Sequence, residues 1–241
     1  MLTYIQALQN GAGTTEYERL VDLLTVNETY FFREEEHFQL LLGELWPEWT
    51  RSGTATIRIW SAGCSTGCEA YTLAMFLKEK GLVGPGRPSV EILATDVNSR
   101  VLQEGREGLY ADFSLRATTP YYRQKYFTRE RHMFRLDPEI RSMVTFRRCN
   151  LLRPEPPLEP SRFHAIFCRN VLIYFDVEAK RRVVENLTRS LATGGVLLVG
   201  RSESLFNVPG APALVSLGGI LVHRKQDEGT AVSGFGPFRN G

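Results

Sequence analysis

The sequence has little net charge, no long apolar run and no recognisable export signal. Its formal charge of +2 is too small to indicate a nucleic-acid binder, so any electrostatic steering needs a local patch. No apolar run approaches the length of a membrane span. Residues 1–10 lack the basic start and apolar core of a secretory signal. We therefore expect a cytoplasmic protein.

Cysteine is also scarce. The four cysteines stand at positions 64, 68, 149 and 168, and no histidine or further cysteine lies near Cys64 and Cys68 to complete a zinc site. The sequence thus predicts free thiols in a reducing compartment and no metal.

A nucleotide-binding pattern occupies residues 56–98. The apolar run beginning at Ile57 ends at two glycines, Gly63 and Gly67. A helical periodicity follows over Glu69–Leu77, and the apolar strand Val90–Thr95 leads to an acidic residue, Asp96. Strand, glycine turn, helix and strand form half of a nucleotide-binding sheet. With 241 residues and 43% apolar content, the chain can bury the core of one α/β domain with a small appendage.

The glycine turn supports two classes of enzyme. Gly63 and Gly67 allow the backbone to approach a ligand at a helix N-terminus, and Asp96 can accept hydrogen bonds from both hydroxyls of a ribose. However, the strict G-x-G-x-x-G spacing is absent, and residues 63–67 also match the G-x-S-x-G turn, which would make Ser65 a hydrolase nucleophile. Asp96 could alternatively cap a helix that begins near Asn98.

The first 50 residues have helical patterns on either side of a polar and aromatic segment. Leucines share one face over Glu16–Thr25, and apolar residues recur at i, i+3, i+4 and i+7 over Glu34–Trp46. Asn27–Arg33 lies between these two helices. We expect residues 1–33 to be a short helical N-terminal segment with its linker.

The second half of the chain returns to strand and helix patterns. Four prolines predict an extended loop over residues 153–160, and Phe163–Cys168 reads as a buried strand. Asp176 can cap a helix through Leu191 that stops at Gly194-Gly195. The remaining predictions are a strand over 196–200, a closing hairpin over 214–225 with Gly218-Gly219 at its turn, and a flexible tail over 226–241.

No glycine occurs between Gly108 and Gly194, and the strand and helix rhythm breaks within this stretch. His132–Leu136 and Met143–Arg147 alternate and are joined by Asp137-Pro138, which predicts a small antiparallel β insertion at about 110–148 in a main domain of 34–225. Basic residues are concentrated in the insertion, and they form either a solvated surface or a docking surface for a partner. They are Arg116, Arg123, Lys125, Arg129, Arg131, Arg135, Arg141, Arg147 and Arg148.

Five blocks, in order, resemble the CheR chemotaxis receptor methyltransferases. They are Asn27-Glu28-Thr29-Tyr30-Phe31-Phe32-Arg33, residues 61–71, Ala94-Thr95-Asp96, Asn150-Leu151-Leu152 and residues 166–175, and residues 200–204 are similar too. The resemblance implies a class I S-adenosylmethionine-dependent methyltransferase fold, with a Rossmann-like mixed sheet and a closing antiparallel hairpin. It implies S-adenosylmethionine as methyl donor and receptor glutamates as acceptors. The products would be glutamyl methyl esters and S-adenosylhomocysteine.

The resemblance also assigns site residues. Asn27, Thr29, Arg33 and Glu69 would line the methionine end of the cofactor, with Gly63 and Gly67 as its floor. Asp96 would hold the ribose. The full set of cofactor-binding residues would be Asn27, Thr29, Arg33, Ala62, Gly63, Glu69, Asp96, Asn150, Leu151, Arg169 and Asn170, and Arg33 and Tyr174 would lie closest to the methyl group.

The proposed chemistry needs no general base. A glutamate side chain with a pKa of roughly 4.3 is already ionised near neutral pH, so alignment of the reactants is the main requirement. A planar Arg33 suits orienting a carboxylate, and the Tyr174 hydroxyl suits a hydrogen bond near the methyl group. The alternatives are that Arg33 pairs with the acidic residues at 34–36, and that Tyr174 is a core aromatic.

Two departures from the family pattern concern the cofactor and the partner. Cys68 and Ala70 flank the retained Glu69 where acidic residues and proline are common, which bears on cofactor affinity. No glycine occurs between Leu109 and Phe146, whereas some members of the family bind a receptor C-terminal peptide with a glycine-containing loop in this insertion. Receptor binding would then not depend on a C-terminal tethering peptide of the receptor. The arginines of the insertion would instead contact the acidic face of a receptor helix bundle. We expect a monomer that neither binds nucleic acid nor inserts into membrane. The rival hypotheses are an RNA or small-molecule methyltransferase, a non-catalytic cofactor-binding regulator, and the Ser65 hydrolase.

Overall fold

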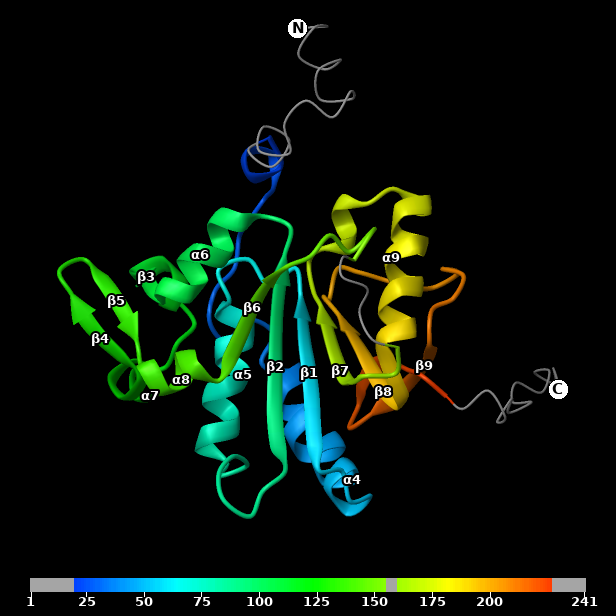
Figure 1. Ribbon diagram of the computed structural model, residues 1–241, viewed down its shortest axis with the longest axis horizontal. Coiled ribbons are helices and arrows are strands. Elements are labelled where there is room, and N and C mark those ends of the chain that lie inside the picture. Colours follow the sequence, from blue (N-terminus) through cyan, green and yellow to red (C-terminus); the bar gives the residue numbers. More distant parts are fainter. Residues whose placement is uncertain (1–19, 155–159, 227–241) are drawn as a thin grey trace, which may run out of the picture.

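The computed structural model describes residues 20–154 and 160–226. A seven-stranded mixed sheet forms its centre, with helices on both faces (Figure 1). The strand order is β6-β2-β1-β7-β8-β10-β9. These strands are β1 (Thr56–Ala62), β2 (Ser89–Asp96), β6 (Val144–Arg148), β7 (Phe163–Cys168), β8 (Leu191–Val199), β9 (Ala213–Leu217) and β10 (Ile220–Arg224). The predicted Rossmann-like mixed sheet, with its closing antiparallel hairpin, is confirmed.

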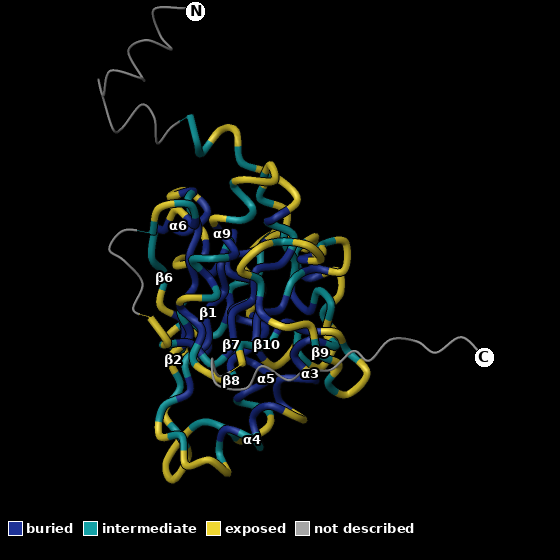
Figure 2. Tube along the Cα trace, turned by 90° about the vertical axis from the view of Figure 1, so that its right-hand side faces the viewer, coloured by how far each residue is buried: buried dark blue, intermediate teal, exposed yellow. Residues whose placement is uncertain are grey.

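Alternate residues of each strand serve the two faces of the sheet. Ile57 and Ile59 of β1 belong to one buried cluster, which they share with α3 (Glu36–Leu40), η1 (Leu41–Leu45), α4 (Trp46–Arg51) and α5 (Cys68–Glu79). Trp60 and Ala62 of the same strand belong to a second cluster, which includes Val183 of α9 (Val177–Ser190). Figure 2 shows the buried trace concentrated along the central strands. The protein is thus a three-layer α/β/α structure.

The strand order reverses beside β1. From β1 the chain proceeds through α5 to β2, and after α6 (Ser99–Glu107) the sheet continues outward to β6. It then returns to place β7 on the other side of β1. The pairings of β1 with β2, β2 with β6 and β1 with β7 are all parallel, as is that of β7 with β8. The carboxyl ends of β1, β2 and β7 therefore meet at a topological switch point, where open α/β sheets bind ligands.

The insertion is smaller than predicted. Its antiparallel sheet has the order β3-β5-β4, formed by β3 (Leu109–Ala111), β4 (Phe127–Glu130) and β5 (Met133–Leu136). It also contains η2 (Asp112–Leu115), α7 (Pro120–Tyr126) and α8 (Pro138–Ser142).

The prediction that Met143–Arg147 pairs with His132–Leu136 is wrong. Asp137 does not form a hairpin turn, because its carboxylate accepts the N–H groups of Glu139 and Ile140 and caps α8. Val144–Arg148 then pairs in parallel with β2 as an edge strand of the main sheet.

Two other boundaries differ from prediction. The helix expected to end at Trp46 continues to Arg51, with Pro47 in the first turn of α4 and a π-helical turn before it. The π-helical turn lies just before this proline, whose missing N–H removes one hydrogen bond from the continuous helix. Gly194 and Gly195 do not end a helix, because α9 stops at Ser190 and both glycines lie within β8. There the N–H of Gly194 donates to Lys225 O at 2.8 Å, beside a register shift in β7.

Several other predictions are confirmed. These are the strands at Val90–Thr95 and Phe163–Cys168, the helix over Glu69–Leu77, the cap at Asp176 and the hairpin with Gly218-Gly219 at its turn. Residues 20–24 are helical, whereas 16–19 of the first predicted helix, most of the proline-rich loop and the tail from 227 lie outside the described residues. Within the described ranges, no helix is long and apolar enough to cross a membrane.

Candidate active site

A cavity of about 310 Å³ lies at the carboxyl ends of β1, β2 and β7. Five segments of the chain form its walls, and all of them contain blocks singled out from the sequence. The lining residues are Leu24, Thr25, Val26, Asn27, Glu28, Thr29, Tyr30, Arg33, Gly63, Cys64, Ser65, Glu69, Asp96, Val97, Cys149, Asn150, Leu151, Arg169, Asn170, Val171, Tyr174 and Phe175. Its size suits a small organic molecule such as a nucleoside cofactor.

The turn after β1 needs glycine for two different reasons. Gly63 has a φ of +78° and lines the cavity, and a Cβ there would lie 2.4 Å from Cγ2 of Val171. Gly67 has a φ of +82° and stands at the N-cap of α5, where a Cβ would lie 2.5 Å from the Phe146 ring. Gly67 therefore permits packing against Phe146, and it is Gly63 that forms the cavity wall predicted for both.

Asp96 is fixed by backbone donors at the tip of β2. Its Oδ2 accepts the N–H of Ser65 at 2.8 Å, and its Oδ1 accepts the N–H of Asn98 at 3.0 Å. Burial raises the pKa of Asp96, and the N–H donors of Asn98 and Ser65 oppose that shift. Each carboxylate oxygen still has a second lone pair for a ligand.

The alternative role of Asp96 as a helix cap is wrong. Asn98 caps α6 instead, since its Oδ1 accepts the N–H groups of Arg100 and Val101 at 2.9 and 3.1 Å.

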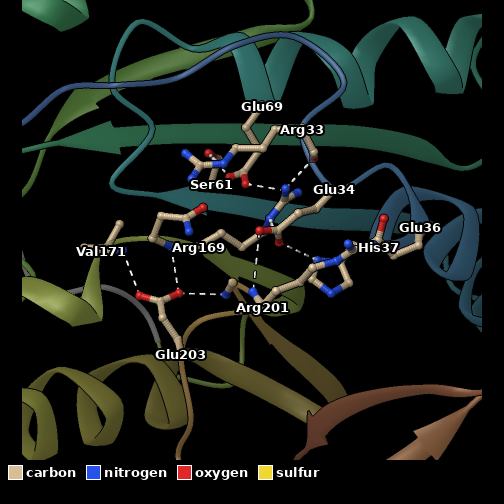
Figure 3. Close-up of polar contacts among 12 residues, drawn as sticks. Arg33, Glu34, Glu36, His37, Ser61, Glu69, Arg169, Val171, Arg201 and Glu203 are labelled. Atoms are coloured by element: carbon tan, nitrogen blue, oxygen red, sulfur yellow. Dashed lines mark hydrogen bonds and ion pairs between the residues drawn. The ribbon is translucent and has the colours of Figure 1, made fainter. Parts of the chain in front are cut away.

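Arg169 is a buried cation between two carboxylates (Figure 3). Its Nε lies 3.4 Å from Oε2 of Glu34, its Nη1 lies 3.5 Å from Oε2 of Glu69, and its Nη2 donates to the carbonyl of Arg33. The guanidinium also lies 5.3 Å from the centre of the Phe38 ring. A side chain held by so many groups is well suited to shape one end of the cavity.

Glu69 faces the cavity from the first turn of α5. The hydroxyl of Ser61 donates to its Oε1 at 2.6 Å. Burial raises the pKa of Glu69, whereas the charge of Arg169 and the Ser61 hydroxyl lower it. Arg169 and the Ser61 hydroxyl thus favour the ionised carboxylate, against the effect of burial.

The loop after β7 is held by a residue that sequence reasoning did not assign to the site. Glu203 accepts the N–H groups of Asn170, Val171 and Leu172 at 2.7, 2.9 and 2.7 Å, and that of Gly200 at 2.7 Å. Figure 3 shows this carboxylate facing the loop. The only sequence signal was the similarity of residues 200–204 to the family pattern, which carries no information about the contact.

The segment Asn27–Arg33 crosses the cavity and is tied to three elements. The carbonyl of Asn27 accepts the Ser65 hydroxyl at 2.8 Å. The N–H of Phe31 donates to Ser114 O at 3.0 Å, and that of Phe32 donates to Thr72 Oγ1 at 3.1 Å. These bonds, formed to the glycine turn, the insertion and α5, hold the segment against the site.

The structure brings the predicted site residues together, with the exceptions of Ala62 and Gly67. Asn27, Thr29, Arg33, Gly63, Glu69, Asp96, Asn150, Leu151, Arg169, Asn170 and Tyr174 all line the cavity. Ala62 is buried at the end of β1 and is not among the lining residues. Tyr174 is 59% exposed, so the alternative that it is a core aromatic is wrong. Glu28, Tyr30 and Cys149 are among the lining residues that sequence reasoning did not assign to the site.

The geometry does not support the hydrolase alternative. Ser65 has a φ of +50°, as a nucleophile turn would, but its hydroxyl donates to the carbonyl of Asn27. None of the four histidines, all within the described residues, lines the cavity. His164 accepts the N–H of Arg58, and His223 contacts the carbonyl of Pro212. Ser65 therefore has no general base.

All four cysteines are free, as predicted, and the structure shows all four to be buried. Cys64 and Cys149 line the cavity. Burial raises the pKa of Cys64 and Cys149, and raises that of Cys68 to about 12. These thiols are therefore protonated near neutral pH and act as small apolar side chains.

Comparison with known proteins identifies the family. The family model described as CheR methyltransferase, SAM binding domain, matches residues 27–217. The chain is 37% identical to a chemotaxis protein methyltransferase of Borreliella burgdorferi over 84% of its length and 73% of the relative. It is 36% identical to chemotaxis protein methyltransferase 1 of Pseudomonas aeruginosa, covering 91% of this chain and 81% of that one. It is 35% identical to the chemotaxis protein methyltransferase of Escherichia coli, over 83% of this chain and 69% of that relative. The chain belongs to the CheR methyltransferase family and is a methyltransferase that uses S-adenosylmethionine.

Proposed function

We propose that this enzyme transfers the methyl group of S-adenosylmethionine to glutamate side chains of chemotaxis receptors. The products are glutamyl methyl esters and S-adenosylhomocysteine. The observation that carries the proposal is the cavity at the switch point, whose lining residues fall almost entirely within the matched family domain. The names of the relatives, chemotaxis protein methyltransferases, support receptors as the substrate class.

The residues present fit the cofactor. Asp96 retains acceptor capacity at the tip of β2, where a ribose would lie. At the other end, the buried Oδ1 of Asn170 makes no hydrogen bond within the described residues and can accept one from the amino group of a methionine moiety. The guanidinium of Arg169, which makes long ion pairs of 3.4 and 3.5 Å with Glu34 and Glu69, is the cation available for the methionine carboxylate. Asn150 and Leu151 remain our candidates for the residues that flank the adenine ring of the cofactor.

The reaction needs alignment more than acid or base chemistry. S-adenosylmethionine supplies a methyl group activated by its sulfonium, and an ionised glutamate attacks it without prior loss of a proton. Arg33 would orient that carboxylate, and the Tyr174 hydroxyl would contribute a hydrogen bond near the methyl group. Because Tyr174 lines the cavity and is exposed, it stands at the opening through which an acceptor side chain must enter.

The substrate surface would be the acidic face of a receptor helix bundle. The basic insertion, Arg116–Arg148, remains our candidate for docking it, in a monomeric enzyme that does not require a receptor tethering peptide. Several of its cations already have acidic partners: Arg123 pairs with Asp112, Arg135 with Glu130 and Lys125 with Glu79. Binding to receptor fragments with and without the C-terminal tail tests this point, and strong dependence on the tail would contradict it.

One experiment tests the reaction. The enzyme is incubated with S-adenosylmethionine labelled in the methyl group and with receptor cytoplasmic fragments, and the product is then treated with base. We expect label in the receptor that is released by alkali as methanol, because carboxyl methyl esters hydrolyse readily. Label that resists alkali, or that enters RNA instead, would refute the proposal and favour the rival methyltransferases.

A further inference from the structure

Arg116 of the insertion has surroundings that none of the catalytic roles above uses. Its guanidinium carbon lies 3.7 Å from the centre of the Tyr30 ring and 3.8 Å from that of Phe113. Its Nη1 donates to the carbonyl of Phe113 at 2.8 Å. Stacking on two rings and a backbone bond hold the guanidinium plane in one orientation, which reduces the entropy lost when it binds a carboxylate.

This arginine is joined directly to the cavity wall. Tyr30 and Glu28 both line the cavity, and the Nη2 of Arg116 lies 3.0 Å from Oε1 of Glu28. The Tyr30 ring also contacts the guanidinium of Arg33, at 5.5 Å from its centre. Arg33 and Arg116 are therefore cations beside the same ring, one within the cavity and the other just outside it.

The position of this cluster is at the opening of the cavity. The Glu28 side chain is 65% exposed although it lines the cavity, and Phe113 is 65% exposed beside Arg116. With Arg33, Arg116 and Glu28 together, the rim carries one net positive charge. Such a rim attracts an anionic surface and provides an apolar face beside it.

The Glu28 partner is weakly held. An ion pair with an exposed carboxylate contributes little, because water and salt screen it, so an incoming carboxylate can replace it. A substrate helix presents side chains in pairs, because residues three and four apart lie on the same face. A helix with an acidic residue one turn from the acceptor glutamate can thus offer one carboxylate to Arg33 and the next to Arg116.

We propose that Arg116 is a specificity-determining residue that binds an acidic side chain of the substrate, one helical turn from the acceptor glutamate. The substrate carboxylate replaces that of Glu28 as the ion-pair partner of Arg116. The inference rests on the proposed function, since it names the feature of the receptor helix that the same site selects. Phe113 and Tyr30 act as the platform that holds the guanidinium.

The chain offers a matched control. Arg123 lies in the same insertion, stacks on Phe134 at 4.2 Å from the ring centre and pairs with Asp112. Neither Phe134 nor Asp112 lines the cavity. Arg116→Gln and Arg123→Gln therefore remove the same charge from similar surroundings, and only the first removes it from the cavity rim.

The test measures binding and turnover separately. Affinity of each variant, saturated with S-adenosylhomocysteine, is measured for a receptor fragment, together with KM for the fragment, kcat and affinity for S-adenosylmethionine. We expect Arg116→Gln to weaken fragment binding and raise KM about tenfold, equivalent to about 1.4 kcal/mol, with kcat and cofactor affinity within twofold of the parent. Arg123→Gln also removes a charge of the proposed docking surface, so it should weaken fragment binding somewhat, but clearly less than Arg116→Gln does, because Arg123 does not contact the cavity wall.

A second fragment tests the contact itself. Neutralising the acidic residues one turn from the acceptor should weaken binding to the parent and leave binding to Arg116→Gln unchanged, since the partner group is already absent. Equal losses for Arg116→Gln and Arg123→Gln would show diffuse attraction by the insertion and overturn the inference. A parallel loss of cofactor affinity in Arg116→Gln would show a purely structural role and would also overturn it.

These results are distinguishable from failure of the proposed function. If the parent binds the fragment but transfers no alkali-labile methyl group, the proposed reaction fails, and the binding comparison still decides the role of Arg116. If the parent does not bind the fragment at all, both proposals are overturned.

Discussion

Glu203 accepts the backbone N–H of Asn170 at 2.7 Å, across 33 residues of sequence. The same carboxylate accepts the next two N–H groups of that loop and the N–H of Gly200. One side chain from the loop after β8 thus determines the path of the loop after β7. That second loop brings Arg169 and Tyr174 to the cavity, so a residue outside the cavity wall controls the shape of the wall.

Glu203→Ala should destabilise the fold and weaken cofactor binding together. Removal of the carboxylate leaves four N–H groups without their acceptor, and we expect a loss of about 3 kcal/mol in the free energy of unfolding. Urea denaturation and titration with S-adenosylhomocysteine measure the two effects. The control is Glu178→Ala, which removes an exposed carboxylate whose ion-pair partners among the described residues are Arg181 and Arg182 on α9. If both variants unfold at the same urea concentration, the structural role of Glu203 is refuted.

Gly63→Ala should reduce stability and cofactor binding more than Gly53→Ala, a substitution that introduces the same backbone strain away from the cavity. Gly53 has nearly the same φ, +77° against +78°, but a Cβ on Gly53 meets nothing within 4 Å. Gly53→Ala should therefore lower the free energy of unfolding by about 1–2 kcal/mol, which is the strain of placing an alanine in the left-handed backbone region. Gly63→Ala should lower the free energy of unfolding by about 1–3 kcal/mol more than Gly53→Ala does, because its Cβ displaces Val171. It should also weaken the binding of S-adenosylhomocysteine.

The double variant Gly63→Ala with Val171→Ala provides the check on this explanation. Removing the two γ-methyl groups of Val171 removes the nearest obstacle to the new Cβ. Calorimetric binding should recover part of the lost affinity in the double variant, and no recovery would mean that the clash is not the cause.

Asp96→Asn should reduce both stability and cofactor affinity. An asparagine side chain presents only one oxygen, so its amide nitrogen would face either the Ser65 or the Asn98 N–H, which both donate to Asp96. We expect a loss of about 1–2 kcal/mol in the free energy of unfolding and at least a tenfold loss of affinity for S-adenosylhomocysteine. Asp176→Asn is the control, because asparagine caps a helix as well as aspartate does and Asp176 lies outside the cavity wall.

The pH dependence of cofactor binding should report on Glu69. Burial raises the pKa of Glu69, and the Ser61 hydroxyl opposes that shift. If the ionised carboxylate binds the cofactor, affinity falls as pH falls through this raised pKa. Ser61→Ala removes a donor to the ionised form, so the pKa should rise further and the acidic fall in affinity should move to higher pH. Ser89→Ala, which removes an exposed hydroxyl bonded to Thr56, should leave the profile in place. A shift to lower pH in Ser61→Ala would contradict the assignment.

Arg33→Lys tests the orienting role of a planar cation. Lysine retains the charge but not the fork that grips a carboxylate in a fixed orientation. We expect kcat at saturating substrates to fall at least tenfold, with little change in the free energy of unfolding. Near-normal turnover would mean that charge alone suffices and would contradict the proposed role of Arg33.

The parts of the fold that sequence reasoning predicted are those with local causes. The apolar run before Gly63, the helix after it and the strand that leads to Asp96 each follow from residues that are neighbours in sequence. The cap at Asp176 and the hairpin at Gly218-Gly219 are local as well. The site residues were found for a different reason, since the order of five blocks resembled a family whose site is assembled from them.

Errors arose where a local pattern allowed two partners. Val144–Arg148 alternates like a hairpin strand, but the edge of β2 was the partner that the tertiary fold made available. Gly194 and Gly195 resemble a helix stop, but in the structure they let β8 pass a register shift beside β7. Strand pairing depends on which edge is unpaired, and no sequence window contains that information.

By itself, the sequence determined the α/β class, the cofactor-binding order of strand, turn, helix and acidic residue, and the family. Only the tertiary structure decided that Arg169 lies between Glu34 and Glu69, that Glu203 holds the loop of Asn170, and that Arg116 lies beside the ring of Tyr30. The physical reason is the range of the interactions. Backbone propensities and caps act over a few residues, whereas a buried charge selects its partners by position in space, from segments that the sequence separates by tens of residues.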